Sequence, residues 1–126
     1  MAGKIVADTL EHSTAGSVTT DYVVNGSAKA WLNINASVTL QDSLNISSMT
    51  DNATGNFSSN FSSSFGNAYY APSGQAGWNT ANTNARIVWT THAAPTTSTH
   101  RFGVAIDNGN EEDSYVMNET YMGDLA

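Results

Sequence analysis

Two stretches of this chain alternate between apolar and polar side chains, and this period of two constrains the fold more than any other feature. From residue 30 to residue 40 every even-numbered position is apolar, and the odd-numbered positions from 33 onward are Asn, Ser or Thr. From residue 57 to residue 65 every even-numbered position is Ser or Asn, and Phe occupies positions 57, 61 and 65. Successive side chains of a β-strand point to opposite faces. Each stretch therefore predicts a strand with one face in a core and the other in water.

Turn-forming residues separate these strands from further β-rich segments. We expect strands at 17–25, 68–71, 85–92, 100–106 and 114–122, and a β-hairpin over 43–65 with its loop at 50–56. The dipeptides Asn25-Gly26 and Asn108-Gly109 predict turns, and residues 73–84, which follow Pro72, predict a loop. Short strands at a spacing of about ten residues predict an all-β domain, a small antiparallel β-sandwich or jelly-roll-like head.

The first residues differ from this body. We expect residues 1–25 to form a short extended N-terminal arm and residues 26–126 to form the head. The apolar anchors of the arm are sparse, namely Ile5, Val6 and Leu10. Val6 and Leu10 lie four positions apart, so one short helical turn would place them on the same face. The arm is either a frayed terminus or a segment that attaches the chain to another protein.

The charge balance excludes two classes of partner. The chain has 4 Lys and Arg against 11 Asp and Glu, which gives a formal net charge of −7. Nucleic acid and anionic membranes are bound through clustered basic residues, so we expect neither. No cysteine is present, which excludes disulfides and thiolate metal sites. The start of the chain lacks a signal-peptide pattern and no apolar run approaches the ~18 residues of a membrane span, so we expect synthesis in the cytoplasm without membrane insertion.

The apolar content favours association between copies of the chain. Apolar residues make up 40% of the sequence, fewer than in a typical globular domain, so a single copy would have a thin core. The edge strands of its sheets must also be covered. A homo-oligomer that buries area between identical subunits would meet both needs.

The sequence favours a non-enzymatic protein. No Gly-x-Ser-x-Gly element surrounds any serine, and the candidate bases are His12, His92 and His100. His92 and His100 flank a turn, which predicts an exposed cross-strand contact, with a metal or catalytic pair as the alternative. The carboxylates of residues 111–113 lie in a hydrophilic turn, which does not provide the buried acid that glycoside hydrolysis needs.

The same acidic turn is the candidate metal site. Ca²⁺ prefers carboxylate and carbonyl oxygens, and Asp107, Glu111 and Asp113 would supply them. The segment lacks the twelve-residue loop with a terminal bidentate Glu. A solvated turn without any cofactor is therefore one interpretation, and a weak or intersubunit Ca²⁺ site is the other.

An aromatic residue in the predicted 73–84 loop points to a ligand. Trp78 lies between glycine-containing segments, where burial is difficult, and Gln75 and Asn79 flank it. Aromatic faces and amide groups suit the apolar faces and hydroxyl groups of sugars. We therefore take Tyr70, Gln75, Trp78 and Asn79 as a candidate carbohydrate-binding set. The alternative is that the Trp78 ring covers the edge of a neighbouring subunit.

Residues 28–70 also resemble a β-rich module of the tail fibres and fibre-like virion proteins of tailed bacteriophages. The resemblance rests on the run KAWLN, continued by SLNISSMTDNATGNF, SNF and AYY. The residues that match are Lys29, Ala30, Trp31, Asn33, Ser43, Asn45, Ser47, Ser48, Thr50, Asp51, Asn52, Thr54, Gly55, Asn56, Phe57, Asn60, Phe61, Ala68 and Tyr69.

The resemblance implies a virion location and a homotrimer with an attachment side at the N-terminus, where Ile5, Val6 and Leu10 would contact another virion protein. It implies a structural role as a short tail fibre or adhesin-like module that is displayed on the particle and contacts host-surface glycans. The alternative is a capsid decoration, cement or head-fibre protein that stabilises the shell.

Overall fold

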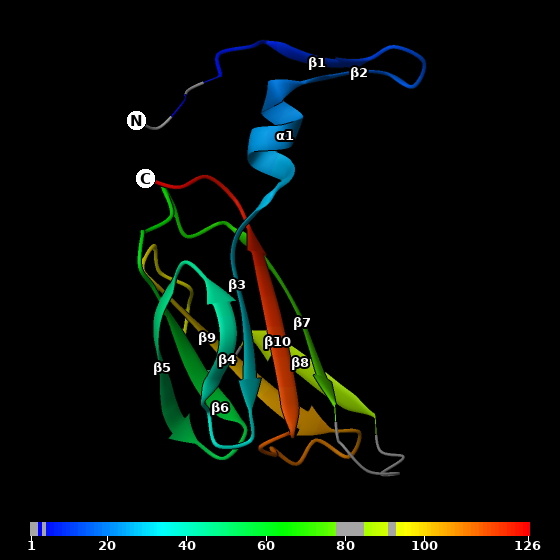
Figure 1. The fold of residues 1–126 in the computed structure, drawn as a ribbon. Coiled ribbons are helices and arrows are strands. Elements are labelled where there is room, and N and C mark those ends of the chain that lie inside the picture. Colours follow the sequence, from blue (N-terminus) through cyan, green and yellow to red (C-terminus); the bar gives the residue numbers. More distant parts are fainter. Residues whose placement is uncertain (1–2, 4, 78–84, 91–92) are drawn as a thin grey trace.

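The computed structural model describes residue 3 and residues 5–77, 85–90 and 93–126. Two four-stranded antiparallel sheets pack face to face and form a β-sandwich (Figure 1). The first sheet has the order β4 (Leu40–Leu44), β3 (Ala28–Asn35), β10 (Val116–Met122) and β7 (Ala71–Gly77). The second has the order β5 (Ile46–Ala53), β6 (Asn56–Phe61), β9 (Thr99–Ile106) and β8 (Arg86–Thr90). The predicted all-β sandwich is confirmed.

The core lies between the two sheets and follows the predicted period of two. Leu32 and Ile34 of β3 face Phe57 and Phe61 of β6, and all four side chains are buried. The other members of this core cluster come from β3, β9, β10 and the segment between β6 and β7, namely Ala30, Phe65, Tyr70, Phe102, Val104, Met117 and Tyr121. Burial of these side chains is the main stabilising term of the head.

A single asparagine carries the chain from one sheet to the other. Asn45 lies between β4 and β5 and has a φ of 57°, a left-handed conformation that Asn adopts more readily than most residues. Its side chain accepts a hydrogen bond from the Ser63 backbone nitrogen at 2.6 Å and donates one to the Ser63 carbonyl at 3.0 Å. These bonds fix the corner where β4 turns into β5.

The structure shortens the strand expected over 30–40 and also the second strand of the following hairpin, which ends at Phe61, while it extends the first strand of that hairpin. β3 ends at Asn35, whose side-chain oxygen accepts hydrogen bonds from the backbone nitrogens of Ser37 and Thr39, both at 3.0 Å. This local bonding competes with the strand ladder. In the hairpin, β5 continues to Ala53, so the predicted 50–56 loop reduces to a tight turn in which Gly55 has a φ of 65°.

The strand expected at 68–71 starts later and replaces the first part of the predicted 73–84 loop. β7 spans Ala71–Gly77 and pairs with β10 along its whole length. Pro72 is compatible with this strand because β7 is at the edge of its sheet, where a missing N–H can face away from the neighbour. Residues 78–84 of the predicted loop lie outside the described residues.

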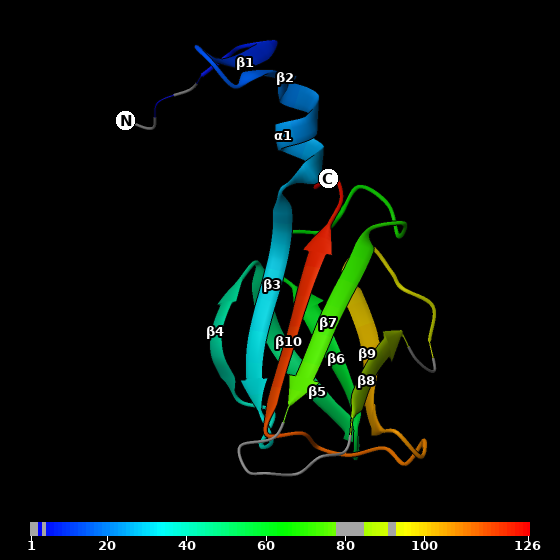
Figure 2. The same cartoon turned by 90° about the vertical axis from the view of Figure 1, so that its right-hand side faces the viewer.

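Residues 5–27 form an N-terminal extension that projects from one end of the head (Figures 1 and 2). It consists of a hairpin of β1 (Thr9–His12) and β2 (Gly16–Thr19), followed by helix α1 (Thr20–Gly26). The strand predicted over 17–25 is therefore wrong beyond Thr19, and Asn25-Gly26 ends a helix rather than forming a hairpin turn. The Thr20 hydroxyl and backbone nitrogen bond to the Ala7 and Asp8 carbonyls, which closes the hairpin and starts the helix.

The ammonium group of Lys29 fixes the end of α1 to the start of β3. It donates hydrogen bonds to the carbonyl oxygens of Val24 and Ser27. A cation near the C-terminal carbonyls of a helix is favoured by the helix dipole. The helix ends at Gly26 and β3 starts at Ala28, close to the predicted boundary between residues 25 and 26.

Candidate functional site

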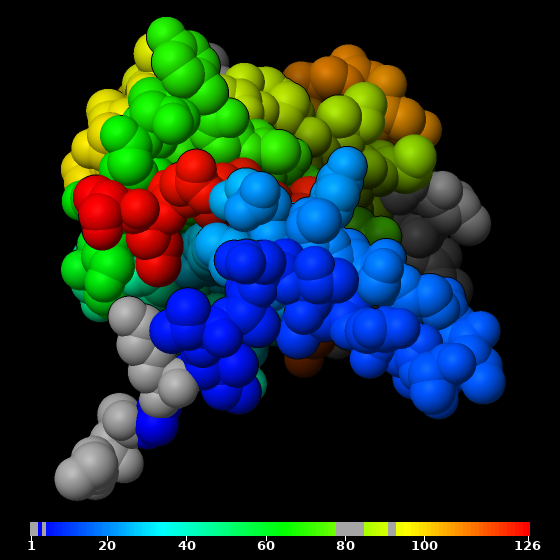
Figure 3. Space-filling view, turned by 90° about the horizontal axis from the view of Figure 1, so that it is seen from above, coloured from blue at the N-terminus to red at the C-terminus, as the bar shows by residue number. Residues whose placement is uncertain are grey.

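The N-terminal extension exposes nearly all of its apolar side chains. No residue from 5 to 29 is buried, and Ile5 and Tyr22 are 91% and 74% exposed. The remaining exposed large apolar residues of the extension are Val6, Leu10, Val18, Val23 and Val24. Figure 3, seen from above, places the extension across one end of the head, beside the C-terminal residues. A monomeric soluble protein rarely leaves so many neighbouring apolar groups in water.

The accessible surface of the whole chain is correspondingly large. It measures 7602 Å², whereas a compact monomer of 13.3 kDa exposes roughly 6,450 Å². The projecting extension, in which no residue from 5 to 29 is buried, contributes to this difference. Helix α1 has 7 residues, and isolated helices below ~12–15 residues are marginal in water. Both observations favour a partner that covers the extension.

The predicted attachment residues meet in one hollow of this extension. Ile5, Val6 and Leu10 line it together with Thr20 and Val24. The expected helical turn over Val6 and Leu10 is wrong, because Leu10 lies in strand β1. Folding of the β1–β2 hairpin instead returns the chain past residues 5–10 and places α1 beside them (Figure 1). The contribution of α1 was missed because the sequence predicted a strand there.

The predicted carbohydrate-binding set is not assembled. Tyr70 is only 6% exposed, its ring packs against Phe61 and Phe65, and its hydroxyl donates to the Thr99 carbonyl at 3.1 Å. The expectation that Tyr70 presents its ring to a ligand is therefore wrong, because its environment is the apolar core. Gln75 is exposed on β7. Trp78 and Asn79 lie outside the described residues.

The acidic turn makes structural contacts. Asp113 accepts a hydrogen bond from the Gly55 nitrogen at 2.7 Å, and Glu112 forms an ion pair with Arg86 at 3.1 Å. Asp107 and Glu111 are exposed. Among the residues that the structure describes, Asp107, Glu111 and Asp113 are not gathered into a group that could hold a metal ion. Calcium binding by this turn therefore stays a sequence prediction without a formed ligand set.

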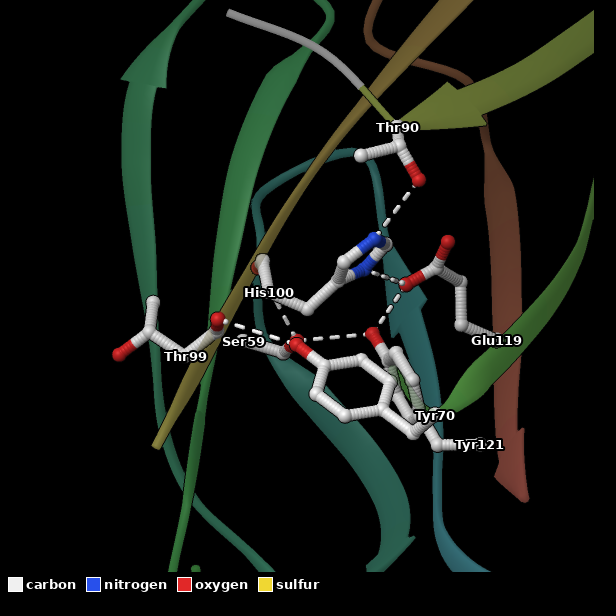
Figure 4. Close-up of polar contacts among 7 residues, drawn as sticks. All are labelled: Ser59, Tyr70, Thr90, Thr99, His100, Glu119 and Tyr121. Atoms are coloured by element: carbon white, nitrogen blue, oxygen red, sulfur yellow. Dashed lines mark hydrogen bonds and ion pairs between the residues drawn. The ribbon is translucent and has the colours of Figure 1, made fainter. Parts of the chain in front are cut away.

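A polar network lies inside the head, between the two sheets (Figure 4). His100 of β9 and Glu119 of β10 are 0% and 3% exposed, and His100 Nδ1 lies 3.2 Å from Glu119 Oε2. The other ring nitrogen of His100 is 2.9 Å from the Thr90 hydroxyl. The Tyr121 hydroxyl donates to Glu119 Oε2 and lies 2.8 Å from the Ser59 hydroxyl. Every buried side-chain nitrogen and oxygen of the described residues has a hydrogen-bond partner.

This environment keeps the two tyrosines protonated. Burial, reinforced by the negative charge of Glu119, raises the pKa of Tyr70 to about 12. Burial also raises the pKa of Tyr121 above its ordinary value, and the Glu119 carboxylate adds to the effect because it accepts the hydrogen bond of the phenol. Desolvation disfavours the charged phenolate, so both hydroxyl groups act as hydrogen-bond donors.

The network ties the two sheets together in the interior of the head, where His100, Glu119 and Ser59 are buried. The prediction of an exposed contact at His100 is wrong, because its ring is fully buried and stacks on Phe102. His92 lies outside the described residues. Polar groups that are completely paired within a core favour one arrangement of the packed layers. The network therefore acts as a structural link between β9 and β10.

Comparisons with models of protein families, with curated proteins and with solved structures found no match to this chain. In the part of the chain that the structure describes, no helix has the length and apolar character needed to cross a membrane.

Proposed function

We propose that this chain is a structural protein of a bacteriophage virion, a short tail-fibre or adhesin-like module without catalytic activity. The observation that carries the proposal is the apolar, unburied N-terminal extension at one end of a compact β-sandwich. The extension attaches the chain to the particle, and the head is displayed on the outside. The resemblance of residues 28–70 to phage fibre modules supports the same assignment.

The extension docks onto another virion protein through the hollow lined by Ile5, Val6, Leu10 and Val24. Residues 5–27 contain Asp8, Glu11 and Asp21 and no Lys or Arg. Electrostatic complementarity favours opposite charges across an interface. The docking partner is therefore a protein with an apolar ridge and basic residues at its rim.

Copies of the chain associate as a homotrimer in the particle. The excess of accessible surface over a compact monomer supports association, and the number three comes from the resemblance to trimeric fibre proteins. Sedimentation velocity of the purified chain tests this step. A trimer at micromolar concentration agrees with the proposal, and a stable monomer would contradict it.

Immuno-gold labelling of intact phage particles with an antibody against the head tests the assignment. We expect gold at the tail or tail tip. Gold on the capsid shell would contradict the tail assignment and indicate a decoration or head-fibre protein. If purified particles show no gold label, the virion role itself is contradicted.

A further inference from the structure

A hollow with an uncharged lining lies at the end of the head opposite the extension. It has a volume of about 270 Å³, and its polar and aromatic lining consists of Asn33, Asn35, Ser37, Gln41 and Tyr115. β3 ends and β10 starts there, at the lower end of Figures 1 and 2. The Tyr115 side chain is 46% exposed, so part of its ring is accessible to a ligand.

The hollow continues into a row of polar side chains across the outer face of the first sheet. Strand register places Asn33 of β3 beside Asp42 of β4 and Asn118 of β10, and places Asn118 beside Gln75 of β7. Paired residues of antiparallel strands share one face of the sheet. The row thus crosses all four strands, and it contains Gln75 from the sequence-predicted ligand set.

The side-chain amides at this end form hydrogen bonds that hold them in place. These bonds leave some of the amide donors and acceptors for a ligand. Asn33 Nδ2 donates to Asn118 Oδ1 at 2.6 Å, and a side-chain amide has two donors and one acceptor with two lone pairs. This bond uses neither the Asn33 oxygen nor the Asn118 nitrogen. Asn35 Oδ1 accepts from the backbone of the 36–39 turn, and that bonding leaves its nitrogen as a donor.

The turn that forms one wall of the hollow is held by contacts with the core. Val38 has a φ of 56°, which is rare for a β-branched residue. Its backbone nitrogen donates to the Asn35 carbonyl at 2.9 Å, and its side chain packs against the core cluster. Strained backbone persists only where surrounding contacts enforce it. The lining residues 35–37 are therefore positioned before any ligand arrives.

We propose that this hollow binds a neutral saccharide. A sugar ring presents hydroxyl groups that both donate and accept, which amide and hydroxyl side chains can match. Its apolar C–H face packs on an aromatic ring, which Tyr115 offers. The volume of about 270 Å³ is just below the range of typical small-molecule sites, about 300–1,000 Å³, so the hollow accommodates about one sugar ring.

The ligand is neutral because the lining has no charged residue to pair with an ionic group. The nearby Asp42 and the net charge of −7 repel anionic sugars. The inference rests on the proposed function only for its biological setting, in which the hollow would face away from the particle. The match between the hollow and a sugar depends only on the residues that line the hollow.

Saturation-transfer NMR and amide chemical-shift mapping of the full chain test the site. The probes are glucose, galactose, mannose and N-acetylglucosamine at millimolar concentration, with sialic acid as the charged comparison. We expect at least one neutral sugar to shift the amides of residues 33–37, 41 and 115–118, and sialic acid to shift none of them. Tyr115→Ala and Gln41→Ala should each weaken binding about tenfold, since each removes a direct contact.

Tyr69→Ala is the matched aromatic control, because its ring is 93% exposed and lies outside the hollow. It should leave affinity unchanged, and circular dichroism checks that all variants are folded. The inference is overturned if no neutral sugar shifts these amides or if both hollow variants bind as the parent does. Loss of binding in Gln75→Ala together with full binding in Gln41→Ala would also overturn it. None of these outcomes affects the immuno-gold test of the virion role.

Discussion

His100 and Glu119 face each other across the interior of the head, with Nδ1 of the imidazole 3.2 Å from Oε2 of the carboxylate. They come from opposite sheets, and both side chains are nearly inaccessible to water. Glu119 also accepts the hydrogen bond of Tyr121. Loss of the carboxylate would therefore leave His100 Nδ1 without its partner and leave the Tyr121 hydroxyl with Ser59 alone.

Replacement of Glu119 by Leu is expected to lower the free energy of unfolding by about 1–3 kcal/mol, the cost of leaving a buried hydrogen-bonding group without its partner. The Glu119→Leu, His100→Phe double variant should lose less than the sum of the two single variants. Urea unfolding of the parent, Glu119→Leu, His100→Phe and the double variant gives the coupling free energy between the two side chains. A loss below about 1 kcal/mol in Glu119→Leu, or strict additivity, would contradict the coupling.

Alkaline pH should destabilise the head through the buried tyrosines. The pKa of Tyr70 rises from 10.0 to about 12 on folding, so between these values the unfolded chain has lost a proton that the folded chain keeps. Unfolding then releases protons, and the free energy of unfolding falls as pH rises above 10. Tyr121 acts in the same direction, since its pKa is also raised.

Denaturant titrations between pH 8 and pH 12 measure this decrease of the free energy of unfolding with pH. Tyr70→Phe should make the decrease smaller, because one of the two titrating buried phenols is gone and the Tyr121 contribution remains. Tyr69→Phe should leave the decrease unchanged, because that side chain is 93% exposed. Stability that is constant over this range would contradict the placement of Tyr70 in the core.

The sequence predicts the buried and exposed faces of the strands well, but it predicts the His100–Glu119 pair poorly. The alternation in 30–40 and 57–65 correctly assigns Leu32, Ile34, Phe57 and Phe61 to the core, because burial of one face is what selects that pattern. The sequence did indicate that Glu119 is buried, because it alternates with the polar positions of the last strand in the same way as Met117 and Tyr121, which point inward. Its partner could not be read from the sequence, because the contact depends on how the two sheets stack.

The glycine turn between β5 and β6 provides a third prediction. A Cβ on Gly55 would lie 2.5 Å from the Val104 carbonyl oxygen and 2.6 Å from the Glu112 nitrogen, and its φ is 65°. Gly55→Ala should lower the free energy of unfolding by about 2–4 kcal/mol, from backbone strain and overpacking. Gly109→Ala is the control, because its φ of 85° is similar but nothing lies within 4 Å. Thermal unfolding that ranks Gly109→Ala as the more damaging variant would refute this packing.

The aromatic cluster provides a fourth prediction. The Phe61 ring lies 4.9 Å from that of Phe65, 5.5 Å from that of Tyr70 and 5.1 Å from that of Tyr121. Phe61→Ala should cost about 3–5 kcal/mol through lost burial and the cavity that remains. Tyr69→Ala should stay within about 0.5 kcal/mol of the parent, as exposed substitutions do. Equal effects of the two substitutions in guanidinium unfolding would show that Phe61 is not in the core.

The N-terminal extension is the part that sequence patterns describe least. Val23 and Val24 favour a strand by propensity, yet they lie in α1. A helix of this length shows no full apolar stripe, so periodicity cannot identify it. The hollow beside Tyr115 was also missed, because it depends on the turn in which Asn35 and Val38 end β3.

We propose that the extension holds the chain on the particle through the hollow lined by Leu10 and Val24. The most direct measurement is the number of copies retained on purified virions that carry a Leu10→Ser, Val24→Ser double variant. Ile87→Ser is the matched control, because Ile87 is 53% exposed on the head. We expect the double variant to be largely lost from particles, the control to be retained and both heads to stay folded. Equal retention of the two variants would contradict it.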